Sequence, residues 1–467
     1  MNPPAASPMT PAPPAPRPAP APPRSYQFPR FERRTLRNGM QLVVAPVTKL
    51  PLATVIAVME AGAAVEPAGQ EGVAALTARL LLEGAAGMDG ATLADRFECL
   101  GASVESHADW DVAAVSLTAL TKQLPEALAL VRDLLRAPEF PAREVTRLKE
   151  ERLAELLQQR AEPRGLADEQ FARALYAPSA RYAWPADGDT SSVRALTRDD
   201  VRAFYAARYS PAGLTLVVAG DVTMAQASTL VEGLFGDWAG ERPGAAATGI
   251  DAAQPGRLAR VVGKAAAPQS EVRVGHLGLS RRAPDYFDAM VMNAVLGGLF
   301  SSRINLNLRE AHGFTYGAFS GFEWRRGMGP FVVSTAVKSV DTAAAVREIL
   351  GEIERMRREE IGEEELTLAT SYLDGVFPIR YETTSAIAAA LANLVIHELP
   401  DDYQDRYRER VRAVTTQGVL RAAQAHLHPD QLRVVVVGDP AVIATGLGDV
   451  VGMPTDVVSP DQTERPA

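Results

Sequence analysis

Two kinds of apolar pattern alternate along the first half of the chain. Short runs of branched and small apolar residues, of strand length, occupy residues 39–47, 52–62 and 111–120. Apolar positions recur every three or four residues, as on one face of a helix, in residues 72–84, 91–101, 124–138 and 142–162. The first half is therefore predicted to contain strands in adjacent pairs and helices in clusters.

The second half repeats these patterns. Strand-like runs cover residues 270–280 and 329–337, and a helix is predicted over 284–298. Paired strands and clustered helices favour an α+β fold, in which helices pack on a largely antiparallel sheet, over a parallel doubly wound sheet. No glycine-rich nucleotide-binding loop lies between a predicted strand and a predicted helix in either half.

A duplicated segment relates the two halves. Residues 196–222 (LTRDDVRAFYAARYSPAGLTLVVAGDV) align without a gap with residues 414–440 (VTTQGVLRAAQAHLHPDQLRVVVVGDP), at a constant offset of 218 residues. Each copy is predicted to be a helix capped by a threonine, Thr197 or Thr415, followed by a proline-containing turn and a strand that ends at Gly-Asp. An offset of this length indicates duplication of a whole domain, because solenoid repeats have periods of about 20–50 residues.

The repeat predicts two homologous domains, residues 30–238 and 258–450. The linker between them, residues 239–257, is poor in large apolar residues and is interrupted by proline and glycine. Proline dominates the N-terminal end, so residues 1–29 are predicted to be a disordered tail that acts as a spacer. Residues 451–467 are expected to be a second disordered tail.

Composition narrows the classes of function. The 467 residues are 47% hydrophobic and 22% charged, enough apolar material for at least two cores. A formal net charge of −9 without a long Lys/Arg run argues against nucleic acid or an anionic membrane as a partner. No apolar run reaches the roughly 18–20 residues that a membrane-spanning helix needs.

Cysteine content and the N-terminus add two further expectations. The single cysteine, Cys99, excludes an intrachain disulfide and a metal site built from cysteines. The N-terminus has no apolar signal-peptide region, which predicts a cytoplasmic protein. The periplasm is the alternative for a chain whose signal peptide has been removed.

A predicted helix near the start of the first domain bears on the chemistry. The segments TLRNGMQLVV (residues 35–44) and AGAAVEPAGQEGVAALTARLLLEGA (61–85) resemble the N-terminal region of the insulinase and pitrilysin family of metallopeptidases, the inverzincins. Active members carry H-x-x-E-H on this helix, in which two histidines bind zinc and the glutamate polarises the attacking water. The resemblance places Ala75 and Arg79 at the histidines and Ala78 at the glutamate. None of the three can do this chemistry.

The family's third zinc ligand is a glutamate on a later helix, and Glu155 occupies the matching place. We hypothesise that the Arg79 guanidinium replaces the missing cation and forms an ion pair with Glu155, within about 4 Å. None of the six histidines has a second histidine four residues further on, and His426 and His428 are interpreted as polar residues at a helix end. The chain is therefore expected to hold no zinc and no other cofactor.

The second domain retains a longer motif. Residues 296–324, LGGLFSSRINLNLREAHGFTYGAFSGFEW, resemble the family's C-terminal motif, with Arg309 and Tyr316 seven residues apart and Gly313 permitting the turn between them. The resemblance implies that Arg309 contacts the substrate backbone and that the Tyr316 hydroxyl hydrogen-bonds near the scissile bond, facing zinc across an enclosed chamber. Taken singly, Arg309 would be an ordinary residue at a helix C-terminus and Tyr316 an ordinary strand residue.

Together these resemblances imply a subunit of a two-chain enzyme, forming one half of a clamshell. The chain resembles the non-zinc subunit of a bacterial heterodimeric peptidase, related to the subunits of the mitochondrial processing peptidase. Its expected partner is a homologous zinc-bearing peptidase subunit, its expected substrates are unfolded peptides, and it is expected to be inactive alone. The alternatives are a structural homologue, like the core subunits of the respiratory cytochrome bc complex, and a chaperone-like peptide-binding protein.

Overall fold

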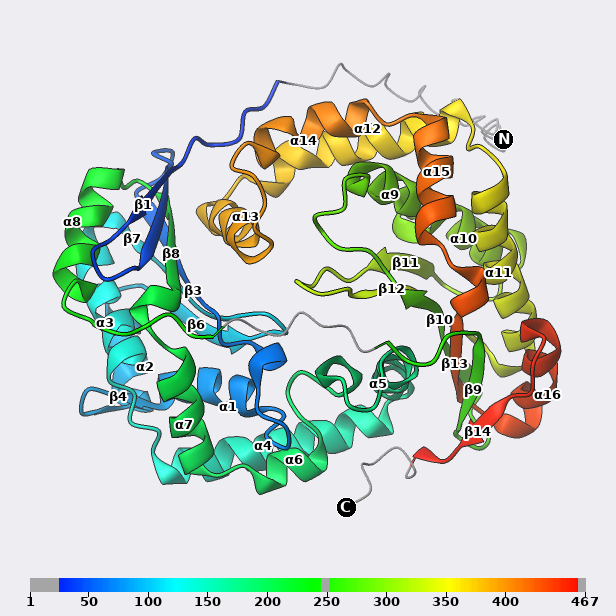
Figure 1. The fold of residues 1–467 in the computed structure, drawn as a ribbon, viewed down its shortest axis with the longest axis horizontal. Helices are drawn as coiled ribbons and strands as arrows, with labels where there is room; N and C mark the ends of the chain where they lie inside the picture. Colours follow the sequence, from blue (N-terminus) through cyan, green and yellow to red (C-terminus); the bar gives the residue numbers. More distant parts are fainter. Residues whose placement is uncertain (1–24, 245–251, 461–467) are drawn as a thin grey trace, which may run out of the picture.

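The computed structural model describes residues 25–244 and 252–460, which form two halves, each built on one six-stranded sheet (Figure 1). The strands of the first half are β1 (Glu32–Thr35), β2 (Gln41–Pro46), β3 (Leu52–Met59), β4 (Gly84–Ala85), β5 (Met88–Asp89), β6 (Ser103–Ala108), β7 (Ala113–Leu120) and β8 (Leu214–Gly220). Its helices are α1 (Val73–Leu80), α2 (Gly90–Cys99), α3 (Leu124–Arg136), α4 (Ala142–Ala161), α5 (Pro163–Leu175), α6 (Thr190–Ala195), α7 (Arg198–Arg208) and α8 (Met224–Phe235). The pair β4 and β5 forms a separate small hairpin.

The second half has a similar inventory. Its strands are β9 (Leu258–Gly263), β10 (Gln269–Leu277), β11 (Ala318–Phe322), β12 (Pro330–Lys338), β13 (Arg433–Gly438) and β14 (Asp456–Val458). Its helices are α9 (Tyr286–Asn293), α10 (Arg303–Asn305), α11 (Thr342–Arg358), α12 (Glu363–Arg380), α13 (Thr384–Ile396), α14 (Tyr403–Arg412), α15 (Thr416–His426) and α16 (Pro440–Val451).

The two sheets share one strand order. The first runs β1-β2-β8-β3-β7-β6, and the second, read from its C-terminal strand, runs β14-β9-β13-β10-β12-β11. The neighbours β2 and β8 are parallel, as are their counterparts β9 and β13, whereas the pairs made by β3, β7 and β6 and by β10, β12 and β11 are antiparallel. Only the sixth strand differs, because β1 is antiparallel to β2 and β14 is parallel to β9. The predicted α+β fold with largely antiparallel sheets is confirmed.

The duplicated segment forms equivalent elements in the two halves. Helices α7 and α15 each begin after the predicted threonine cap: Thr197 Oγ1 accepts a hydrogen bond from the Asp200 N–H at 3.2 Å, and Thr415 Oγ1 from the Gly418 N–H at 3.0 Å. A short turn then leads into β8 or β13, and both strands end at the glycine of Gly-Asp.

The central strands are buried on both faces. In β2, Leu42 and Val44 belong to one apolar cluster and Val43 and Ala45 to another, because successive side chains of a strand point to opposite faces. The same alternation occurs in β13, where Val434 and Val436 belong to one cluster and Val435 and Val437 to another. Each sheet therefore needs a covering layer on both sides.

One of these layers comes from the opposite half. Helix α13 of the second half packs on β3 and β8, and α5 of the first half packs on β10 and β13 (Figure 1). Both helices have 13 residues. Phe171 of α5 shares a cluster with Val435 and Val437, and Gly275 of β10 permits its approach, since a Cβ there would lie 2.9 Å from the Phe171 ring. The hydroxyl of Thr54 on β3 lies 3.0 Å from that of Thr384 on α13.

The ends of the described chain are more ordered than the sequence predicts. Phe28 falls in the predicted tail 1–29, but it is buried and its ring meets Tyr381 edge-to-face at 5.2 Å. The predicted tail from residue 451 is wrong for its first part, because Val451 ends α16 and β14 pairs with β9. Both segments are short, and they are held by contacts with distant residues that no local pattern shows. Residues 1–24, 245–251 and 461–467, which include most of the predicted tails and part of the linker, lie outside the described residues.

The exchange of helices predicts that a cavity in α13 destabilises the protein strongly. Leu391 of α13 is fully buried in the cluster that includes Val217 and Ala219 of the first sheet, so Leu391→Ala should lower the free energy of unfolding by about 3–5 kcal/mol. Leu157→Ala is the matched control, because Leu157 on α4 is 74% exposed, and should change it by less than about 0.5 kcal/mol. Urea unfolding followed by circular dichroism measures both; equal effects would contradict the role given to α13.

Candidate functional site

Helix α1 is anchored at its first turn. Gly72 precedes it with φ of +96°, a left-handed conformation that favours glycine, and a Cβ there would lie 2.7 Å from the Asp187 carbonyl oxygen. The buried Glu66 carboxyl group accepts hydrogen bonds from the Gly72 and Ala74 N–H groups at 3.0 and 2.8 Å, and from Arg181 Nε at 2.7 Å. Burial raises the pKa of Glu66 to about 7, against the opposing effect of Arg181 and the two N–H groups.

The three positions of the degenerate zinc motif lie in different surroundings on α1. Ala75 and Arg79, four residues apart, line the same cavity, as helical spacing requires. Ala78 is fully buried, and its carbonyl accepts a hydrogen bond from Ser106 Oγ on β6 at 2.6 Å. The methyl groups at positions 75 and 78 neither ligate zinc nor activate water.

Arg79 forms two ion pairs with α4. Its Nη2 lies 3.0 Å from Glu151 Oε2 and its Nη1 lies 3.5 Å from Glu155 Oε1. The hypothesis that Arg79 pairs with Glu155 is confirmed. Glu155 also accepts a hydrogen bond from Arg152 Nη1 at 3.2 Å. The side chains of Arg79, Glu151 and Glu155 are 36–47% exposed, so each pair contributes only about 0–1 kcal/mol.

A cavity of about 340 Å³ lies beside α1, between this helix, β6 and α4. Three of its lining residues carry groups that can bind zinc, namely His107, Glu155 and Asp187. They do not converge: within residues 25–244 and 252–460, no three His, Cys, Asp or Glu side chains are grouped so that they could hold a metal ion. A fixed guanidinium at Arg79 also repels a cation. These residues therefore do not fit the zinc site of active family members.

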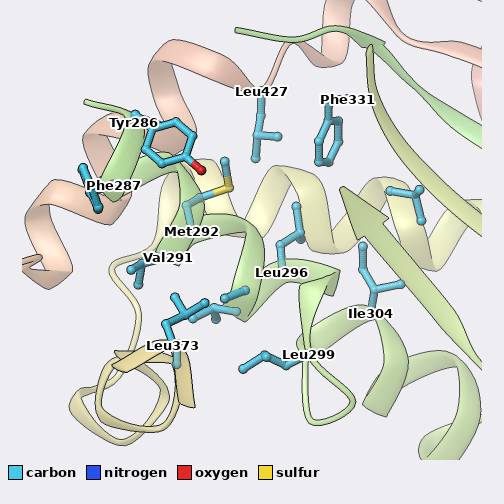
Figure 2. Packing of buried hydrophobic residues seen from close by; sticks show 14 of the residues in the cluster. Tyr286, Phe287, Val291, Met292, Leu296, Leu299, Ile304, Phe331, Leu373 and Leu427 are labelled. Carbon is cyan, nitrogen blue, oxygen red and sulfur yellow. The ribbon is translucent and has the colours of Figure 1, made fainter. Parts of the chain in front are cut away.

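The second motif lies on a segment that is firmly held in the core of the second half. Helix α10 continues into a π-helical turn, η7 (Leu306–Ala311), and Ile304 and Leu308 of this stretch are fully buried. Figure 2 shows Ile304 among the packed side chains of this core, with Leu296 and Leu299. Buried Asn305 donates a hydrogen bond to the Phe300 carbonyl at 2.6 Å and accepts one from the Ala318 N–H at 3.0 Å. It thereby ties the loop before α10 to β11.

The two motif side chains themselves are accessible. Tyr316 is 95% exposed, and the Arg309 side chain is 35% exposed. The Arg309 guanidinium carbon lies 4.5 Å from the centre of the Phe300 ring, and its Nε lies 3.6 Å from Glu310. Gly313 between them has φ of +65°, which agrees with the expected turn. No hydrogen bond or ion pair joins Arg309 to Tyr316 in the described part of the chain.

The structure thus brings together the residues of the degenerate zinc motif, but within the described residues it shows no hydrogen bond or ion pair between the two residues of the second motif. Ala75, Arg79 and Glu155 meet at one cavity of the first half, whereas Arg309 and Tyr316 lie in the second half on one short segment. The sequence did not identify Glu151, which lies nearer to Arg79 than Glu155 does. Its position one helical turn before Glu155 is the signal that could have identified it.

Comparison with known proteins supports the resemblance seen in the sequence. Residues 43–181 match the family model "Insulinase (Peptidase family M16)", and residues 195–373 match "Peptidase M16 inactive domain". The chain belongs to the M16 peptidase family.

M16 relatives include proteins described as proteases and one described as inactive. An uncharacterized zinc protease of Mycobacterium tuberculosis is 24% identical over 427 residues, 91% of this chain and 96% of that protein. The probable mitochondrial-processing peptidase subunit beta of Schizosaccharomyces pombe is 25% identical over 280 residues, 58% of this chain and 59% of that protein. The non-peptidase homolog YmxG of Helicobacter pylori is 24% identical over 405 residues, 84% of this chain and 90% of that protein.

Solved structures agree with the M16 fold. The peptidase M16 inactive domain from Pseudomonas fluorescens has a TM-score of 0.82 at 25% identity, covering 88% of this chain and 98% of that one. A protease from Helicobacter pylori has the same TM-score at 18% identity and shows the fold alone. In the described parts of this chain, every helix is too short or too polar to cross a membrane.

The available donor groups predict the metal content of the protein. Because α1 offers Ala75, Ala78 and Arg79 where ligands and base are needed, tag-free purified protein should contain far less than one zinc per chain. Its thermal unfolding temperature should not change when EDTA is added. Mass spectrometry of metals and differential scanning fluorimetry measure these; one bound zinc per chain, removed by EDTA with loss of stability, would contradict the prediction.

Proposed function

We propose that this M16 chain is the non-catalytic, substrate-binding subunit of a heterodimeric zinc metallopeptidase. It supplies Arg309 and Tyr316 to the active site of a homologous subunit that carries the zinc. The chain alone does not hydrolyse peptides, and the reaction requires both subunits. The substrates are unfolded peptides.

The observation that carries this proposal is the contrast between the two halves. In the first half, Arg79 is paired with Glu151 and Glu155, and the cavity beside it does not fit zinc. In the second half, buried Ile304, Asn305 and Leu308 anchor the backbone segment that carries Arg309, and Asn305 ties it to β11 just after Tyr316, while both motif side chains reach solvent. A rigid scaffold under exposed donors is the arrangement expected of a site that binds a ligand.

The two side chains suit a peptide bond under attack. A guanidinium offers planar donors that pair with a peptide carbonyl, and the phenol O–H donates one further hydrogen bond. Donors already fixed in position stabilise the negative charge that develops on the carbonyl oxygen during hydrolysis. Neither group activates water or binds zinc, so the zinc and its base must come from the partner.

The family comparisons support the non-catalytic part of the proposal. The match to a model described as an inactive domain covers residues 195–373, the region that contains Arg309 and Tyr316. The Helicobacter pylori relative named a non-peptidase homolog aligns with 84% of this chain. Several other relatives are named zinc proteases, which is the activity proposed for the partner subunit.

The Arg309 and Tyr316 side chains are expected to act on catalysis and not on stability. With the zinc-bearing partner present, Arg309→Ala and Tyr316→Phe should each lower kcat/KM for a fluorogenic peptide by about 100- to 1000-fold. Unfolding temperatures should stay close to that of the parent, since both side chains reach solvent.

Two substitutions on exposed positions serve as matched controls. Arg358 at the end of α11 is 76% exposed and Tyr372 on α12 is 53% exposed, and Arg358→Ala and Tyr372→Phe should leave the rate unchanged. A partnered enzyme whose rate does not respond to Arg309→Ala or Tyr316→Phe would refute the proposed role. Such a result would favour a structural or chaperone-like homologue.

A further inference from the structure

A small pocket outside both motifs is lined by three segments of the second half, two of which contribute two arginines each. Its volume is about 60 Å³, and it is lined by Ser280, Arg281, Arg282, Arg325, Arg326, Ile396, His397 and Glu398. These residues come from the loop after β10, the connection between β11 and β12, and the C-terminal end of α13. This volume has room for a few water molecules or for one tetrahedral oxyanion.

Three of the four arginines have partners within the protein. Arg282 Nη1 lies 2.6 Å from Glu398 Oε2, and Arg325 Nη2 lies 2.8 Å from Glu323 Oε2. Arg326 Nε donates to the Ile396 carbonyl at 2.9 Å, which caps the end of α13. The Arg282–Glu398 pair lies at the surface, whereas the Arg325 and Arg326 side chains are mostly buried. Glu398 is the single acidic side chain among the lining residues.

The fourth arginine, Arg281, has aromatic neighbours in place of an acidic partner. Its guanidinium carbon lies 4.1 Å from the centre of the Tyr286 ring and 5.3 Å from those of Trp324 and Tyr403. Among the described residues, no carboxylate pairs with it and no hydrogen bond to it is found. Burial lowers the pKa of Arg281, which reflects the cost of a charge that has lost water without gaining a counter-ion.

The His397 imidazole experiences the positive charge of the pocket arginines. Its Nδ1 is buried and has no hydrogen-bond partner in the structure. Burial lowers the pKa of His397 to about 4, and Arg281 and Arg326 lower it further, against the smaller opposite effect of Asp109. Two acidic groups of the first half reach Arg326: Asp111 accepts from the Arg326 N–H at 2.8 Å, and Glu60 lies 3.9 Å from Arg326 Nη2 while it also pairs with Arg242 at 2.8 Å. Neither of these described carboxylates pairs with Arg281.

From this geometry we propose that the pocket is a binding site for a tetrahedral oxyanion of the phosphate class, held by Arg281 and the Ser280 hydroxyl beside His397. The anion supplies the counter-charge that Arg281 lacks. The site adjoins the contact between the halves, because the Arg326 N–H binds Asp111 of the first half and His397 ends the exchanged helix α13. Bound anion therefore stabilises the junction of the two halves.

Titration of the full-length chain with inorganic phosphate tests the site. Ionic strength is held constant with sodium chloride, so that general screening does not change. Isothermal titration calorimetry should show one phosphate per chain, and above the dissociation constant the unfolding temperature should keep rising with the logarithm of the phosphate concentration. O-phosphoserine in a parallel titration distinguishes a free anion from a phosphate ester: binding of both means that the pocket admits an ester, and binding of inorganic phosphate alone means a closed anion site.

Variants connect the effect to the pocket. Arg281→Gln should weaken phosphate binding about tenfold or more, because a charge-assisted interaction is lost. Arg358→Gln is the matched control, since Arg358 is 76% exposed on α11 and does not line the pocket. If Arg281→Gln changes the unfolding temperature in the absence of phosphate, the two variants are compared by the rise in unfolding temperature that phosphate produces in each.

A second measurement, on the protein without substitution at Arg281, does not depend on whether the Arg281→Gln variant folds. The His397 imidazole resonances, assigned with His397→Gln, should shift during the titration with the affinity found by calorimetry. The proposal is overturned if chloride at equal ionic strength stabilises the protein as well as phosphate does. It is also overturned if Arg281→Gln and Arg358→Gln bind phosphate alike, or if the His397 resonances do not move.

Discussion

Burial of the second face of each sheet is the constraint on which the rest of this structure depends. The strands β2, β8, β9 and β13 carry apolar side chains on both faces, and the helices of one half cover only one of them. The other face is covered by α13 in the first sheet and by α5 in the second. Separating the halves would expose the face of each sheet that the opposite half covers, at a free-energy cost of about 25 cal/mol per Å² of apolar surface. The two halves therefore form a single unit of stability, although each has its own sheet.

The exchanged helices also position the sites. Helix α4, which carries Glu151, Arg152 and Glu155, is followed almost directly by α5, so the wall of the degenerate zinc cavity adjoins a helix anchored in the opposite half. In the second half, α13 ends at the arginine pocket. The walls of these two cavities are thus attached to the elements that hold the halves together.

The loss of metal chemistry from α1 did not require the loss of the helix. Its buried side, which includes Val73, Leu76 and Leu80, packs in the core of the first half, and Glu66 caps its first turn. Two of the three motif positions line the cavity, where Ala75 leaves space and Arg79 makes half-exposed ion pairs, while Ala78 is buried. The side chains at positions 75 and 79 can therefore differ without loss of the apolar packing on the opposite side of the helix.

Local pattern and motif spacing in the sequence were enough to predict the two homologous units, the α+β class, the threonine caps at Thr197 and Thr415 and the ion pair of Arg79 with Glu155. These features depend on periodicity, on turn chemistry or on a spacing shared with a family. Other features depend on contacts between residues far apart in the chain: the crossing of α5 and α13, the docking of Phe28 against Tyr381, and the meeting of Arg281 with His397. Helical periodicity shows that α13 has a buried face but not which sheet covers it, and only the folded chain decides that.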